Sequence, residues 1–234
     1  ATAQDKIQRG FAPILEGFSY GEFNNIESFE KLMGDDVAAI LVEPVQGESG
    51  VRPASKQFLK GLKELCKKHG ALLFFDEVQC GVGRCGKFLA SQRIGVKPDG
   101  VSLAKGIGGG FPIGATWLAK PYADLFSPGS HGTTFGGNAL ACAAALATLK
   151  EIDSKKLIEN AFKLGEVLAK GLEKIAKKYP CKIKLTRGLG LMRAVLFQPE
   201  YPNSEVCAKL RKNKLILIPA GANALRFLPP LNTT

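Results

Sequence analysis

Two short apolar runs in this chain each end beside a charged side chain that could take part in chemistry. The run at 71–76, ALLFFD, ends at Asp76, and the run at 101–104, VSLA, is followed by Lys105. A short apolar run bounded by turn residues predicts a buried parallel strand, and parallel sheets carry their chemistry at the carboxyl ends of the strands. We therefore expect a carboxylate and an amine at one edge of the same sheet, although 105 − 76 = 29 positions separate them.

Lys105 and the glycine-rich stretch 106–110 have the character of a Schiff-base site. The amine must be partly desolvated to be nucleophilic at neutral pH, and glycines let the backbone pass close to a ligand. An aspartate that faces such a lysine could pair with the pyridinium nitrogen of pyridoxal phosphate and keep it protonated. Taken singly, a charged residue at a strand end is more often ordinary surface, so the argument depends on the two together.

The elements that position these residues predict an α/β fold with a mostly parallel sheet. A strand at 37–42 ends at Glu43, and a helix capped by Ser55 and ended by Gly70 leads into the strand at 71–76. This strand–helix–strand order predicts a right-handed βαβ unit with Glu43 and Asp76 at one edge. Further strands are expected at 101–104 and 113–118, and an alanine-rich helix is expected at 139–150, capped by Asn138.

The character of the chain changes near residue 152. A long amphipathic helix is expected first, followed by strand-like pieces at 191–197, 215–218 and 224–228. We therefore predict part of a large α/β domain over 1–151 and a smaller α+β domain over 152–234. Arg226 stands in the last of these strands; on local sequence alone, a surface arginine and a ligand-binding arginine are equally good interpretations.

Five stretches in order make the chain similar to a known family. They are EPVQGESG at 43–50, FDEVQCGVGRCG at 75–86, LAKGIGGGFPIGA at 103–115, HGTTFGGN at 131–138 and LRFLPPLN at 225–232. Together they resemble the class III aminotransferases of the fold-type I pyridoxal-phosphate enzymes. The stretches 103–115 and 131–138 most resemble the branch that transfers the terminal amine of N-acetylornithine to 2-oxoglutarate in arginine biosynthesis. Ornithine, succinylornithine, succinyldiaminopimelate and 4-aminobutyrate remain alternative amino donors.

The resemblance implies roles at the cofactor for four residues. Lys105 would carry pyridoxal phosphate as a Schiff base and then act as the base and acid that moves the substrate proton. Asp76 would hold the charge on the ring nitrogen. Gln79 would bond the ring hydroxyl, and Val78 would lie against the cofactor.

The resemblance also implies roles for residues outside the ring site. Arg226 would bind a substrate carboxylate, with Glu48 as its ion-pair partner that swings aside for a dicarboxylic substrate. Glu43 would lie on the substrate side near Gln79, although a solvated loop carboxylate is the simpler interpretation of either glutamate. Thr134, with Thr133 beside it, would reach the cofactor phosphate of the neighbouring subunit, so a homodimer with active sites at the interface is expected.

Two hydrolase motifs compete with this interpretation. GVGRCGK at 81–87 fits the phosphate loop of a nucleotide hydrolase, but the residue after its lysine is Phe88, which lacks the magnesium-binding hydroxyl. GFSYG at 17–21 fits the nucleophile elbow of an α/β-hydrolase, which requires a strand before it and a helix after it.

The composition of the chain excludes further classes of protein. The net charge is +11, but much of it lies between 150 and 184, where pairs such as Glu166–Lys170 indicate a solvated helix face rather than a nucleic-acid site. No apolar run approaches the roughly 20 residues of a membrane span. The six cysteines form no CxxC pair, which favours reduced thiols in the cytoplasm, and with two histidines a zinc site is not expected. Because residues 1–36 lack the family's phosphate-cradling segment, we expect the carboxyl-terminal part of a longer enzyme, trimmed at both ends.

Overall fold

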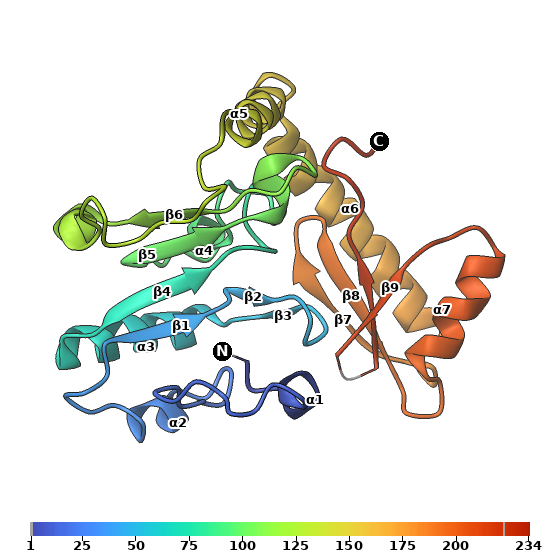
Figure 1. Cartoon of the computed structure of the whole chain (residues 1–234). Helices are drawn as coiled ribbons and strands as arrows, with labels where there is room; N and C mark the ends of the chain where they lie inside the picture. Colours follow the sequence, from blue (N-terminus) through green and yellow to red (C-terminus); the bar gives the residue numbers. More distant parts are fainter. Residues whose placement is uncertain (1, 222) are drawn as a thin grey trace.

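A four-stranded sheet forms the first half of the molecule in the computed structural model, which describes residues 2–221 and 223–234 (Figure 1). The strand order is β1-β4-β5-β6. The first three strands are parallel neighbours and the fourth runs antiparallel to β5; their bounds are Ala39–Val42, Leu72–Asp76, Gly100–Leu103 and Ala115–Leu118. The predicted α/β class with a mostly parallel sheet is thus confirmed, with one antiparallel edge strand.

Helix α3, Lys56–His69, packs against this sheet and forms where the sequence predicts it. The Ser55 side chain accepts a hydrogen bond from the Phe58 N–H at 3.1 Å, and Gly70 ends the helix at a φ of 69°. The apolar face of the helix shares one core with the inward side chains of β1 and β4, including Phe58, Leu59, Leu62, Leu65, Ile40, Val42, Leu73 and Phe75. Burial of this face holds β1 and β4 in parallel contact.

A short hairpin lies between β1 and α3 and was not predicted. Its strands are β2, Val45–Gln46, and β3, Arg52–Pro53. The turn is tight because the N–H groups of Gly50 and Val51 both donate to the Gly47 carbonyl at 3.3 Å. Glu48 stands in this turn, so the hairpin carries it beyond the sheet edge.

The remaining elements of the first half connect the strands. Asn138 caps the alanine-rich helix as predicted, accepting from the Ala141 N–H at 2.9 Å, although this helix extends beyond 150 to Ser154. In chain order the connecting elements are α1 Asp5–Gln8, α2 Ile26–Glu30, α4 Ala90–Ile94, the 3-10 turns η1 Lys105–Gly108 and η2 Lys120–Leu125, and α5 Ala139–Ser154.

A second sheet, wholly antiparallel, forms the carboxyl-terminal half, with the order β7-β8-β10-β9 (Figure 1). Its strands are Ile183–Leu189, Met192–Phe197, Ala224–Phe227 and Ile218–Ala220, in that spatial order. Helix α6, Leu157–Lys178, packs on this sheet, and α7, Asn203–Lys212, lies beside β9. The predicted strand at 215–218 is wrong in position, because pairing with β10 begins at Ile218. The sequence interpretation also missed β7 and α7, whose charged residues hide the apolar pattern.

The two halves share a buried cluster. Val45 and Val51 of the hairpin region pack with Cys80 and Cys85 of the loop after β4, and with Met192, Ala194 and Ala224 of the second sheet. The hairpin and the loop 77–89 are therefore held between the two sheets. The predicted division at 151/152 falls near the end of α5 and stays a prediction.

Two expectations are decided by the secondary structure. The segment 17–21 is irregular and, within the described part of the chain, no strand precedes it, since β1 begins at Ala39; the hydrolase elbow is therefore wrong. None of the helices in the described residues combines the length and the apolar character that crossing a bilayer requires.

Candidate active site

Three strand ends bring charged residues to one edge of the first sheet. Asp76, the last residue of β4, is the register partner of Ser102 in β5, three positions before Lys105. Glu43 directly follows Val42, whose partner in β4 is Phe75. Because β1, β4 and β5 are parallel, Glu43, Asp76 and Lys105 follow the carboxyl ends of three neighbouring strands. The structure thus brings together the acid and the amine that the sequence separates.

Lys105 opens the turn η1 with an unusual backbone. Its φ is 47°, in the left-handed region that a non-glycine residue rarely adopts. Lys105 is exposed, so its amine is not desolvated in this structure, contrary to the expectation from the sequence. Residues held in such a conformation cluster at active sites and ligand-binding sites.

The acids at this edge have distinct environments. Asp76 is half-buried and accepts a hydrogen bond from the Val78 N–H at 2.9 Å. Glu43 accepts from the Gly47 N–H at 3.0 Å. Burial raises the pKa of Glu43; the Gly47 hydrogen bond opposes this rise, the charge of Asp76 adds to it, and the charge of Lys105 opposes it. Both charged neighbours therefore act on the Glu43 carboxyl, and the three form one electrostatic cluster.

Arg226 lies within hydrogen-bonding distance of two polar side chains from the first half of the chain. Its Nη1 donates to Glu48 Oε1 at 2.7 Å and to Gln79 Oε1 at 2.8 Å, and Gln79 Nε2 donates to Glu48 Oε1 at 3.2 Å. The Arg226 side chain is only 6% exposed, whereas that of Glu48 is 63% exposed. The hydrogen bond from Arg226 lowers the pKa of Glu48, so this pair stabilises the fold above the ordinary carboxyl range and the stabilisation is lost as the pH falls.

Within the described part of the chain, the hydrogen bonds of Arg226 all come from Nη1, which leaves its buried Nε as a further donor. Its Nε is buried and has no hydrogen-bond partner among the described residues. A buried donor without a partner is costly, and in a guanidinium it leaves one arm of the fork free for a further acceptor. The predicted carboxylate site is therefore chemically sound at this residue.

Close packing explains why this cluster forms. Arg226 sits on β10, a central strand of the second sheet, opposite Ala194 of β8 and Ile218 of β9. A Cβ at Gly47 would lie 2.0 Å from Gln79 Oε1, so only glycine lets Gln79 reach Arg226 here. The expected bond from Gln79 to a ring hydroxyl is untested and stays a prediction, as do the roles of Val78 and Glu43.

Thr133 and Thr134 lie in the exposed loop between β6 and α5. Thr133 lines an open cavity of about 790 Å³ with residues of β5, β6 and this loop, among them Ser102, Thr116 and His131. The contact of Thr133 and Thr134 with the cofactor phosphate of a neighbouring subunit stays a prediction.

Glu77 is a buried acid that the sequence interpretation missed. Its side chain is fully buried and accepts from the N–H groups of Ala90 at 2.5 Å and Ser91 at 2.9 Å. Burial raises the pKa of Glu77, and hydrogen bonds at Ser91 oppose that rise. Glu77 thereby ties the start of α4 to the strand that ends in Asp76. The available signal was a helix start at Leu89–Ala90 without a capping side chain of its own.

We expect Glu77→Gln to lower the free energy of unfolding by about 1–3 kcal/mol, since an amide offers one acceptor where the carboxylate offers two and leaves a buried N–H unpaired. Chemical denaturation measures this. Glu64→Gln, at an exposed position of α3, is the matched control and should change stability little. Equal effects of the two substitutions would contradict the role assigned to Glu77.

The segment 81–87 is not a phosphate loop. Arg84 donates to the carbonyls of Leu191 and Pro229, so the segment docks the loop after β4 against the second half. Lys87 is exposed and lies three positions before the start of α4, whereas a phosphate loop places its lysine at the helix start.

Comparison with known proteins now defines the class. A family model described as aminotransferase class-III matches residues 3–234. The chain belongs to this family, and its membership removes the nucleotide-hydrolase alternative.

Two curated relatives of the chain carry the same name. The acetylornithine aminotransferase of Prochlorococcus marinus (strain MIT 9313) is 44% identical over 239 residues, covering 99% of this chain and 57% of that protein. The protein of the same name from Bacillus subtilis (strain 168) is 44% identical, covering 100% of this chain and 60% of that protein. The chain thus spans less than two thirds of the length of these curated relatives.

Solved structures agree with the fold. The ornithine aminotransferase from Toxoplasma gondii ME49 superposes with a TM-score of 0.93 at 35% identity, covering 99% of this chain and 56% of that chain. The acetylornithine aminotransferase from Elizabethkingia anophelis gives 0.85 at 38% identity, covering 96% of this chain and 58% of that chain. A second T. gondii ornithine aminotransferase structure, with a TM-score of 0.92, 36% identity and coverage of 99% of this chain and 55% of that chain, is described with partial occupancy of PLP at its active site.

Proposed function

We propose that this chain belongs to an aminotransferase that moves the terminal amine of N-acetylornithine to 2-oxoglutarate, giving N-acetylglutamate semialdehyde and glutamate. The observation that carries the proposal is the sheet edge where Asp76 ends β4 and Lys105 follows β5, together with a buried arginine whose Nε has no partner among the described residues. The acetylornithine aminotransferases at 44% identity support this substrate over the alternative amino donors. Ornithine is the strongest of those alternatives, because structures of ornithine aminotransferases share the fold.

The residues at the sheet edge fit pyridoxal phosphate. Asp76 uses one carboxylate oxygen for the Val78 N–H, so the other can accept from a protonated ring nitrogen. The Lys105 amine stands three positions past the register partner of Asp76 and is the proposed attachment point for the cofactor carbonyl. When bound, pyridoxal phosphate supplies an electron sink that stabilises charge at the substrate carbon.

The chain's own residues divide the remaining work. Lys105 Nζ would take the proton from the substrate carbon and deliver it to the cofactor carbon. Asp76 keeps negative charge beside the ring nitrogen. Arg226 would bind a substrate carboxylate through its guanidinium, whose Nη1 is held by Glu48 and Gln79 in the absence of that ligand. The Glu48 carboxylate neutralises Arg226 in the absence of that ligand, which limits the cost of burying the guanidinium.

We further propose a homodimer in which the loop bearing Thr133 and Thr134 meets the cofactor phosphate of a neighbouring subunit, and a cytoplasmic location. The exposure of that loop supports the first proposal. All six cysteines are free thiols in the structure, which supports a reducing compartment.

Initial-rate kinetics with 2-oxoglutarate as acceptor test the proposed donor. We expect kcat/KM for N-acetylornithine to exceed that for ornithine by at least about tenfold, the discrimination that one net hydrogen bond of about 1.4 kcal/mol gives. A preference for ornithine or 4-aminobutyrate would overturn the proposed donor, but it would leave the family and the reaction type in place.

For Arg226→Ala we expect kcat/KM for carboxylate substrates to fall by roughly 30- to 5,000-fold, as expected when one partner of a buried, hydrogen-bonded charge pair is removed. Arg193→Ala is the matched control, since Arg193 lies on β8 of the second sheet but pairs with Glu166 at 3.1 Å. A loss in Arg193→Ala as large as that in Arg226→Ala would contradict the assignment of the substrate carboxylate to Arg226.

A further inference from the structure

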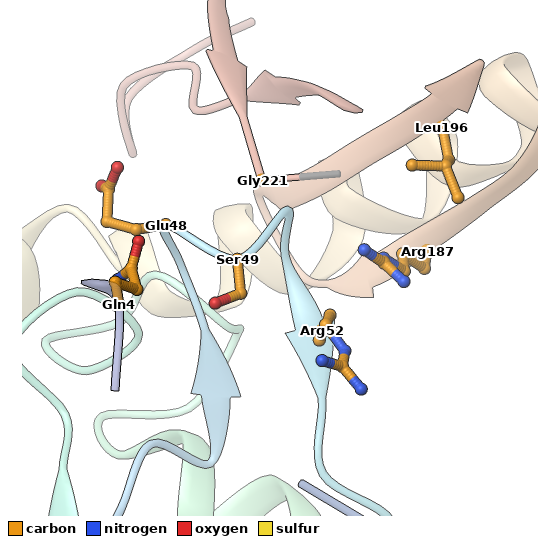
Figure 2. Close-up of a pocket in the computed structure, with 7 residues that line it drawn as sticks. All are labelled: Gln4, Glu48, Ser49, Arg52, Arg187, Leu196 and Gly221. Carbon is orange, nitrogen blue, oxygen red and sulfur yellow. The ribbon is translucent and has the colours of Figure 1, made fainter. Parts of the chain in front are cut away.

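A polar pocket of about 390 Å³ lies beside the Glu48–Arg226 pair (Figure 2). Glu48 and Ser49 of the hairpin turn line it, together with Arg52 of β3 and Arg187 of β7. Figure 2 shows the Glu48 carboxylate turned away from the two guanidinium groups, with the hairpin turn between them. Glu48 and the two arginines thus line the same pocket, and the Glu48 side chain has to change its rotamer to face the two guanidinium groups.

Within the part of the chain that the structure describes, neither arginine of this pocket has an acidic partner. The ion pairs of the described residues involve other arginines and lysines. Arg187 donates its Nε to the Gly50 carbonyl at 2.9 Å, which orients its guanidinium, and Arg52 lies 5.2 Å above the Phe23 ring. Burial lowers the pKa of Arg187, and the charge of Arg52 lowers it further. Two cations that repel each other across a pocket are stabilised by an anion placed between them.

Glu48 is the anion that can move. Its side chain is 63% exposed, while that of its partner Arg226 is 6% exposed. It stands in a turn between two glycines, Gly47 and Gly50, and Gly50 has a φ of 92°. A Cβ at Gly221 would lie 2.3 Å from the Ser49 carbonyl carbon, so the backbone of the turn is packed against the second sheet and the side chain is the mobile part.

Binding of a substrate carboxylate to Arg226 creates the need for this movement. Glu48 and Gln79 already share one arm of the guanidinium, Nη1, at 2.7 and 2.8 Å. A second carboxylate on the same guanidinium lies within a few ångströms of Glu48, and like charges at that distance repel. The Glu48 carboxylate then either goes into solvent or finds another cation.

We propose that Arg52 and Arg187 form a second seat for the Glu48 carboxylate, which Glu48 occupies when Arg226 binds a substrate carboxylate. This inference rests on the proposed function, because it takes Arg226 as the carboxylate site. An ion pair with Arg52 and Arg187 lowers the free energy of the conformation in which Glu48 has left Arg226 and the Arg226 guanidinium can bind a substrate carboxylate. Arg52 and Arg187 are thus positioning residues that favour dicarboxylate binding without touching the ligand.

Calorimetric binding of glutarate, a five-carbon dicarboxylate that cannot react, tests the second seat in the complete cofactor-loaded protein. We expect Arg52→Gln to weaken glutarate binding about 3- to 10-fold, the effect of one partly exposed ion pair. Arg52→Lys keeps the charge and should restore most of the affinity. Arg211→Gln, which removes an exposed charge from α7, is the control and should have no effect.

A double-substitution cycle separates the second seat from direct binding. In the Glu48→Gln background, Arg52→Gln should no longer change glutarate affinity, since an uncharged side chain needs no seat. An equal loss in both backgrounds would mean that the arginines hold the ligand themselves and would overturn the second seat. If Arg52→Gln does not weaken glutarate binding in the protein that retains Glu48, the second seat is overturned as well.

The same glutarate titration distinguishes failure of the proposed function from failure of the second seat alone. Arg226→Lys should abolish most glutarate binding. If it does not, Arg226 is not the carboxylate site, and the proposed function and the second seat fail together. If Arg226 is required but Arg52 and Glu48 are uncoupled, only the second seat fails.

Discussion

Replacing Lys105 by alanine is expected to remove the absorbance band of the Schiff base between the protein and its cofactor and to lower turnover by about 10⁴-fold, the upper range for loss of a catalytic acid–base group. Alanine is the informative replacement because Lys105 has a φ of 47°. A residue with a Cβ keeps the strain of this conformation unchanged, whereas glycine would relieve it and alter stability. Absorption spectroscopy and initial-rate kinetics measure the two effects.

The control for Lys105→Ala is Lys87→Ala. Lys87 is an exposed lysine in the loop after β4, and its loss should leave both spectrum and turnover unchanged. A small primary amine added to the Lys105→Ala protein should restore part of the turnover, because it can carry the proton that Nζ carries. Normal turnover with the absorbance intact in Lys105→Ala would sink the proposed mechanism.

Asp76→Asn has the second-largest expected effect. We expect a fall in kcat of about 10²- to 10³-fold, the loss typical for removal of one preorganised electrostatic group. The amide retains an oxygen that can accept from the Val78 N–H, so the loop after β4 should keep its conformation. The effect should therefore appear in kcat and in the cofactor spectrum, with little change in thermal unfolding.

Asp99→Asn provides the opposite pattern as a control. Asp99 lies just before β5, at the other end of the same parallel pair, where it accepts from Lys63 at 2.6 Å and from the Leu73 N–H at 2.9 Å. Its substitution should lower the free energy of unfolding by about 1.5–3 kcal/mol, as for a hydrogen bond to a charged group, and leave kcat of the folded protein unchanged. If the two aspartates gave the same pattern, the catalytic role of Asp76 would be wrong.

The sheet edge was predictable because its signals are local. An apolar run that ends in Asp76, and another followed by Lys105 and a glycine-rich stretch, identify strand ends without knowledge of their neighbours. Ser55 and Gly70 mark the ends of α3 by capping chemistry that acts within a few residues. These features need no information from distant parts of the chain.

Charged residues with distant partners were not predictable. Glu166 has the spacing of an i, i+4 pair with Lys170, yet it accepts from Arg93 at 2.9 Å and from Arg193 at 3.1 Å. Glu77 reads as the second acid of a strand end but is fully buried beneath the start of α4. In both cases a tertiary partner offers better hydrogen bonds than the local sequence does, and only packing determines which partner is near.

The sequence by itself determined the class of fold, the strand ends that carry Asp76 and Lys105, and the family to which the chain belongs, because local patterns and motif order encode all three. The family resemblance already paired Glu48 with Arg226, and the structure contains that pair. Only the tertiary structure decided that Gln79 joins it and that Arg52 and Arg187 lie beside it. These residues come from two sheets whose contact depends on a shared core and on Gly47 and Gly221, where a Cβ would prevent the approach. Contacts between segments more than a hundred residues apart follow from how the packed surfaces fit, which no local pattern records.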